Sequence, residues 1–138
     1  MKKVALFLIL VFCIGLTGCS KDAEANAFIT EFDSTTKELI SKIDADPSAD
    51  GIDNAQKTYD GKKASLKAKW DAIKDAAEFQ VSADTKKKLE DTVKKNMNDL
   101  VAVSSKHADT IGSDPQASQK FTKLMDDYGN MFADAKTK

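Results

Sequence analysis

Large apolar residues recur along the chain in segments that have the spacing of amphipathic helices. In the first segment, residues 23–45, they step by 4, 7 and 4 positions, which places them on one face of a helix with 3.6 residues per turn. That stripe consists of Phe28, Phe32, Leu39 and Ile43, widened by Ile29, Thr36 and Ile40. No segment shows the alternation with period two that is typical of a strand.

Three further segments repeat this pattern, and we expect helices over about residues 47–79, 82–111 and 115–135. Two glycines interrupt the second segment, and we expect that helix to bend or break near Gly61, because glycine weakens a helix interior. The three stripes are Ile52, Tyr59, Leu66 and Ile73; then Leu89, Val93, Met97, Leu100, Ser104, His107 and Ile111; then Phe121, Leu124, Met125, Tyr128, Met131 and Phe132.

Short polar connections separate the four segments and carry helix-start residues. Asp46-Pro47 and Asp114-Pro115 suit helix starts, because aspartate caps free amides and proline is favoured at the first helical position. Ser82 is the expected cap of the third segment. Short links favour antiparallel neighbours, so the pattern predicts an all-α fold, an up-down-up-down antiparallel four-helix bundle. Segments two and three are the longest, so we expect the central hairpin to extend beyond the other helices.

The first 18 residues differ from the rest of the chain. Lys2 and Lys3 precede an almost unbroken apolar run of 13 residues, 4–16. A membrane-spanning helix needs about 20 apolar residues, so this run is too short to span and instead suits the apolar core of a secretory signal peptide. The run ends in Leu16-Thr17-Gly18-Cys19, which resembles the lipobox of bacterial lipoproteins.

That resemblance implies that Cys19 becomes the mature N-terminus and carries a diacylglyceryl thioether, usually with a further acyl chain on its amine. The alternative for Cys19 is a disulfide with Cys13, but Cys13 lies in the segment that would be removed. We therefore divide the chain into a signal peptide (1–18), a lipidated N-terminus and short tether (19–27) and a helical bundle domain (28–138). The resemblance places the protein in the bacterial envelope. In Gram-negative lipoproteins an aspartate directly after the cysteine tends to retain the protein in the inner membrane. By the same resemblance, Ser20 at this position favours sorting to the outer membrane.

The composition removes several kinds of chemistry. All 21 basic residues are lysine, and the chain has one histidine and five glutamates. A carboxylate di-metal bundle needs a Glu-x-x-His pair on each of two helices, which a single histidine cannot supply. Ser104 and His107 share a helix face, without the further groups that a hydrolytic triad needs. Without arginine, a nucleic-acid site also lacks its usual bidentate contacts. We therefore expect neither catalysis nor nucleic-acid binding.

A metal or haem site is a second interpretation of three residues on the inner stripes, His107, Met97 and Met125. Thioether ligands suit Cu(I), and a Met/His pair can ligate haem. Methionines also fill irregular gaps in helix cores, which is the interpretation we favour, so we expect no cofactor. A small-ligand or metal-binding (copper or haem) bundle in the periplasm stays as the alternative function.

Trp70 is the one tryptophan, and Lys67, Lys69 and Lys74 surround it in sequence. It lies four residues after a core leucine and three before a core isoleucine, which favours a large core residue. If it were exposed among lysines, it would be the best candidate for contact with a partner. The sequence therefore predicts a lipid-anchored, non-enzymatic binding or structural module, with an unidentified envelope protein as its partner.

Overall fold

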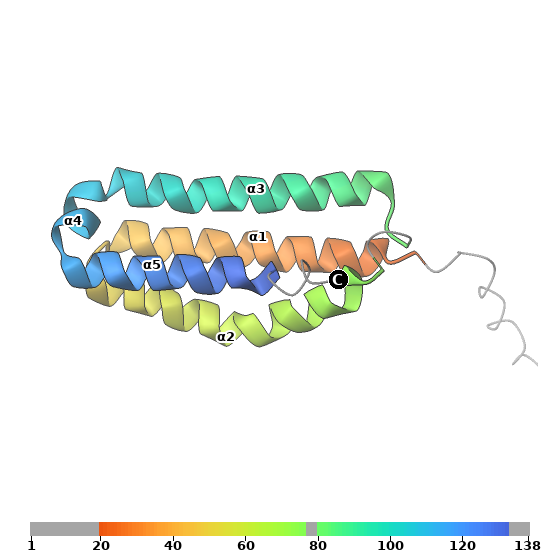
Figure 1. The fold of residues 1–138 in the computed structure, drawn as a ribbon, viewed down its shortest axis with the longest axis horizontal. Helices are drawn as coiled ribbons and strands as arrows, with labels where there is room; N and C mark the ends of the chain where they lie inside the picture. Colours follow the sequence, from red (N-terminus) through yellow and green to blue (C-terminus); the bar gives the residue numbers. More distant parts are fainter. Residues whose placement is uncertain (1–19, 77–79, 133–138) are drawn as a thin grey trace, which may run out of the picture.

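The computed structural model describes residues 20–76 and 80–132, and this part of the chain is helical without a strand (Figure 1). The all-α prediction is confirmed. Four helices are long, and a fifth forms a short corner between the last two of them. In chain order they are α1 (Asp22–Ala45), α2 (Ala49–Lys74), α3 (Ala83–Lys106), α4 (Ala108–Ser113) and α5 (Pro115–Gly129).

Three of the helices begin at a side chain that accepts a backbone N–H from the first turn, as helix caps do. Ser82 caps α3 and Asp114 caps α5, as expected, and Pro115 takes the first position of α5. The cap of α2 is Ser48 and not Asp46. The Asp46 carboxylate instead accepts a hydrogen bond from the Ser48 N–H at 3.1 Å.

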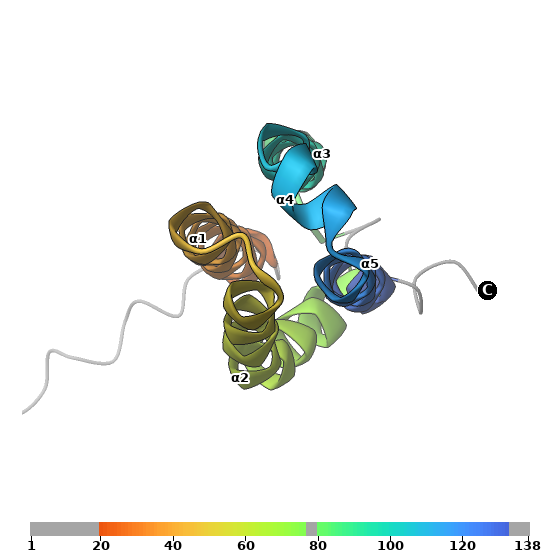
Figure 2. The same ribbon diagram turned by 90° about the vertical axis from the view of Figure 1, so that its left-hand side faces the viewer.

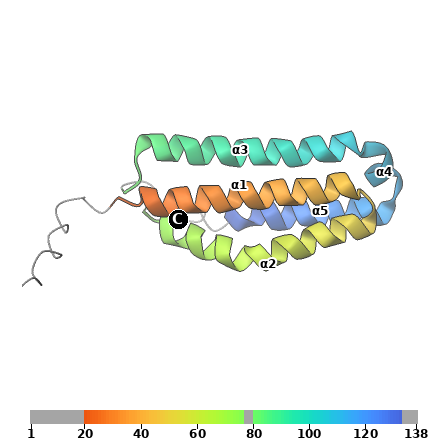
Figure 3. The ribbon, with the colours of Figure 1, turned by 180° about the vertical axis from the view of Figure 1, so that it is seen from behind.

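The long helices alternate in direction, as predicted, but their arrangement around the bundle differs from a simple sequential order. α1 packs against both α2 and α3, and α2 packs against α5. α2 and α3 lie at opposite corners (Figure 2), and α1 runs between them when the molecule is seen from behind (Figure 3). The expected antiparallel contact between consecutive helices therefore fails for α2 and α3, because these two helices lie at diagonal corners of the bundle.

α1 and α3 are consequently parallel neighbours with a constant register. The Ser82 N–H donates to the Asp22 carboxylate at 2.8 Å near the start of both helices. The Lys106 ammonium lies 2.7 Å from the Asp44 carboxylate near their ends. These pairs are 60 and 62 residues apart in sequence, so the two helices advance together.

The lengths of the helices also correct the sequence prediction. α1 and α3 both have 24 residues, α2 has 26 and α5 has 15, so α5 is short and the central helices are not uniquely long. The third segment breaks at His107, where φ is −107° and ψ is 25°. α1 begins at Asp22, close to the start that the first apolar segment predicted, so residues 22–27 of the range assigned to the tether are helical. α2 is continuous through Gly61 and bends midway along its length (Figure 1).

The core is apolar and rich in aromatic rings at the end where α1 starts. Phe28 stacks on Phe32 with ring centroids 5.5 Å apart, and Phe32 stacks on Tyr128 at 5.0 Å. Among the described residues, Val101 is the one large apolar side chain classed as exposed, at 53%. Within this part of the chain, none of the helices combines the length and the apolar character that a membrane span requires.

Candidate functional site

Trp70 belongs to the aromatic core. Its side chain is 9% exposed, and its ring centroid lies 5.5 Å from Phe28 and 5.1 Å from Phe132. The indole N–H is buried and has no hydrogen-bond partner among the described residues. This geometry agrees with the interpretation of Trp70 as a large core residue, and it leaves little of the ring for contact with a partner.

Each of the three lysines near Trp70 in sequence is paired with an acid of α2 or α1. Lys69 forms an ion pair with Glu31 of α1, and Lys74 lies 2.9 Å from Asp71. Lys67 also contacts Asp71, at 3.4 Å. The hydrogen bond from Lys69 lowers the pKa of Glu31, and hydrogen bonds from Lys74 and Lys67 lower that of Asp71. This part of α2 is therefore a mixed-charge surface and not a basic patch.

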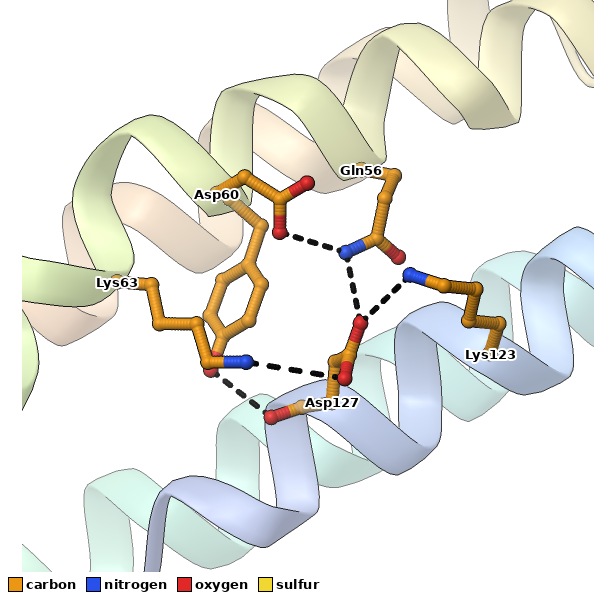
Figure 4. A network of polar contacts seen from close by, with 6 residues as sticks. Gln56, Asp60, Lys63, Lys123 and Asp127 are labelled. Atoms are coloured by element: carbon orange, nitrogen blue, oxygen red, sulfur yellow. Dashed lines mark hydrogen bonds and ion pairs between the residues drawn. The ribbon is translucent and has the colours of Figure 1, made fainter.

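A polar network joins α2 to α5 around Asp127 (Figure 4). The Asp127 carboxylate accepts hydrogen bonds from the Lys123 ammonium at 2.8 Å and from the Gln56 amide nitrogen at 3.0 Å. The Lys63 ammonium lies 3.7 Å from the same carboxylate. The buried Tyr59 hydroxyl donates to the Asp127 backbone carbonyl at 3.0 Å. The bonds that cross between the helices tie the middle of α2 to the last turns of α5.

The pKa shifts in this network keep its acidic groups in their ordinary protonation states, as in a structural contact. The hydrogen bond from Lys123 and the charge of Lys63 lower the pKa of Asp127, which keeps it ionised at neutral pH. Burial raises the pKa of Tyr59 to about 12, with a further contribution from Asp127, which keeps the phenol protonated. The Asp127 carboxylate and the Tyr59 phenol therefore hold their usual charges near neutral pH, so the arrangement suits positioning of α5.

A second polar group lies inside the bundle, between α1, α3 and α5. The Thr36 hydroxyl donates to the Phe32 carbonyl at 2.8 Å and lies 2.5 Å from the Tyr128 hydroxyl. Because Thr36 has a single hydroxyl proton, Tyr128 must be the donor in the contact between them. Burial raises the pKa of Tyr128, and hydrogen bonding by Thr36 and Asn96 partly offsets this shift.

Asn96 is the unusual member of this interior group. Its side chain is 1% exposed, and neither its amide nitrogen nor its amide oxygen reaches full hydrogen-bond geometry with a described residue. A buried polar group without a partner costs roughly 1–3 kcal/mol. Apolar periodicity could not reveal this residue. The indication available in the sequence was that Asn96 precedes Met97 and lies four residues before Leu100, on the inner side of the predicted stripe.

The structure does not bring together the residues of the metal alternative. His107 lies at the break between α3 and α4, where its Nε2 is 2.7 Å from the Asp44 carboxylate. Met97 precedes it by ten residues, which is roughly 15 Å along a helix, so these two side chains cannot share one ion. Met125, on α5, is partly buried against the hydrophobic core of the bundle. Within residues 20–76 and 80–132, no three His, Cys, Asp or Glu side chains are grouped as metal ligands.

Several surface hollows of the described residues are open grooves between two helices. One, of about 570 Å³, lies between α1 and α3, with Ile40 and Val103 among its apolar lining residues and Lys95 and Lys106 among its charged ones. Both lysines are paired, Lys95 with a carboxylate at 2.5 Å and Lys106 with one at 2.7 Å. The groove therefore has an apolar component and a largely compensated charged rim.

The predicted lipidation site, Cys19, lies outside the described residues, but the chain immediately after it is well defined. The Lys21 N–H donates to the Gln80 carbonyl at 2.7 Å. The Asp22 carboxylate accepts from the Ser82 N–H, and this bond is the largest cause of its lowered pKa. The start of α1 is thus fixed to the residues that precede α3.

No model of a known protein family, no curated protein and no solved structure matches the chain.

Proposed function

We propose that the protein is a lipid-anchored, non-enzymatic interaction module of the bacterial cell envelope. The observation that carries the proposal is the order of features in the first 19 residues: two lysines, the apolar run 4–16 and the tetrad ending in Cys19. One acyl chain of myristoyl length holds a protein only marginally, whereas two or more give a stable anchor. A lipidated Cys19 would therefore attach the bundle firmly to a membrane.

The position of α1 supports a bundle held close to that membrane. α1 begins at Asp22, and the three chain steps from Cys19 to Asp22 span at most roughly 11 Å. Lys21 is itself bonded to Gln80, which shortens the free part of the chain further. We infer that the partner is also in the membrane or at its surface.

We propose the outer face of the second half of α2 as the contact surface for an envelope protein. At 3.6 residues per turn, Lys67 and Lys74 flank this face on one side and Lys69 flanks it on the other. The helix surface between these flanks carries small, exposed residues, which lets another backbone approach closely. They are Ala64, Ser65, Ala68 and Ala72. Lysines on such a face give orientation and specificity through charge more than affinity.

The anchor is tested by metabolic labelling with palmitate in the native host. The Cys19→Ala variant is expected to lose the label and to keep its signal peptide, because the acylated thiol is absent. Cys13→Ala is the matched control, since it removes the other cysteine of the chain, and it should be labelled normally. Label that survives Cys19→Ala, or that is absent from the unaltered chain, would refute the anchor.

The contact surface is tested by photo-crosslinking in cells. A photoreactive residue at Ala68, which is exposed on α2, should give one defined adduct. The same residue at Ala102, which is exposed on α3, is the control and should not give that adduct. Equal adducts from both positions, or only heterogeneous products from Ala68, would contradict the proposed surface.

A further inference from the structure

α3 is the least enclosed of the three longest helices. α1 packs against α2 and α3, and α2 packs against α1 and α5, whereas α3 packs along its length on α1 and meets α4 at its end. Figure 2 shows α3 at the corner diagonal to α2, with α1 and α5 at the two corners between them. If α3 moved away, the packing of α1 with α2 and of α2 with α5 would remain.

The inner face of α3 combines apolar residues that pack against the core, Leu89, Val93 and Met97 among them, with buried polar ones. Two of its four buried residues are polar, Thr85 and Asn96, and two are apolar, Leu100 and Val103. Neither amide atom of Asn96 has a hydrogen bond of full geometry while α3 is packed, although its side chain is close enough to the Tyr128 hydroxyl of α5 to help lower the pKa of that group. Water would satisfy both atoms when α3 is open, so the buried amide favours opening.

Exposed polar contacts hold α3 at its two ends. Near its start the Lys88 ammonium donates to the Asn26 side chain at 2.8 Å, and near its end Lys106 and His107 both contact Asp44 at 2.7 Å. Exposed contacts of this kind exchange readily with water. The helix also ends at the His107 break, where the chain can turn without unwinding α3.

We propose that α3 opens from α1 as a unit while α1, α2 and α5 stay packed, and that Asn96 sets the population of the open state. Opening exposes Leu100 and Val103 together with the surface of α1 that α3 covers. In the open state the bundle thereby presents an apolar surface that is buried while α3 is packed. This behaviour depends on neither the lipid anchor nor the contact surface on α2.

The test is hydrogen exchange, followed by mass spectrometry, on the full chain purified in detergent. Amides of α3 should exchange at least tenfold faster than those of α1 and α2, because local opening exposes α3 without global unfolding. Asn96→Leu should slow α3 exchange at least tenfold and by more than it slows α1. Asn98→Leu is the matched control, because it makes the same substitution at an exposed position of the same helix, and it should not slow α3.

A second variant tests the proposal without altering the core. Lys88→Ala removes a contact at one end of α3 and should speed α3 exchange about twofold, with no change in α5. Equal protection of α3 and α1 in the unaltered chain would overturn the proposal. So would unchanged α3 exchange in Asn96→Leu together with a crystal structure in which ordered waters bond both Asn96 amide atoms.

Discussion

The contact between Thr36 and Tyr128 allows a quantitative test of the interior hydrogen bonds. Both side chains are buried, and their oxygens are 2.5 Å apart. Thr36→Val leaves the Tyr128 hydroxyl with a proton and no Thr36 acceptor, which costs roughly 1–3 kcal/mol. Tyr128→Phe leaves the bond from Thr36 to the Phe32 carbonyl intact, so the expected loss is that of one ordinary hydrogen bond, about 0.5–1.5 kcal/mol.

The two single variants and the double variant form a thermodynamic cycle. Removing both partners leaves no unpaired hydroxyl, so the double variant should be less destabilised than the sum of the single changes, by about 1 kcal/mol. Thermal unfolding can measure this, because 1 kcal/mol corresponds to roughly 4 °C in Tm for a domain of this size. Additive effects, or a Tyr128→Phe variant less stable than Thr36→Val, would refute the assignment of Tyr128 as the donor.

Three further predictions concern the stability and sorting of the protein. Gly51→Ala should destabilise the protein, because a Cβ at this position would lie 1.8 Å from the Asp46 carbonyl oxygen. A Cβ at Gly61 meets nothing within 4 Å, so Gly61→Ala should stabilise α2 by up to about 1 kcal/mol in denaturant unfolding. If Gly51→Ala were the more stable of the two variants, the close approach at Gly51 would be contradicted. Burial raises the pKa of Tyr59 to about 12 in the folded protein, so the unfolded state loses the phenol proton first as the pH rises. The free energy of unfolding should therefore fall above about pH 10, and it should fall less steeply in Tyr59→Phe. Equal slopes of unfolding free energy against pH in the two proteins would count against this. Ser20→Asp should move the protein to the inner membrane of a Gram-negative host, and unchanged membrane fractionation would contradict the proposed sorting.

The helices could be predicted from the sequence because their apolar residues have a clear period. Phe28, Phe32, Leu39 and Ile43 are all fully buried, as the first stripe predicted. The same method overestimated the third segment, because no glycine or proline marks the break at His107. It also placed Met97 on the inner face, where the residue is only partly buried.

The order of helices around the bundle could not be predicted in this way. Periodicity indicates which face of a helix is buried, but it does not indicate which neighbouring helix covers that face. The predicted link between the second and third segments is compatible with either an adjacent or a diagonal corner of the bundle. The polar residues were missed for a related reason. Gln56, Asn96 and Asp127 carry interior or interhelical contacts, but polar residues do not contribute to an apolar stripe. Trp70 was the exception, since its spacing from core residues indicated burial and the structure agrees.

The diagonal placement of α2 and α3 has a consequence for the folding kinetics of the protein. Hydrogen bonds between α1 and α3 join residues 60–63 apart, and those between α2 and α5 join residues 68–71 apart. Contacts over such long stretches of chain must close large loops, which slows folding. The α1–α2 pair is the only long-helix pair adjacent both in sequence and in space within the described residues. We expect it to form the nucleus, with α3 and α5 added later.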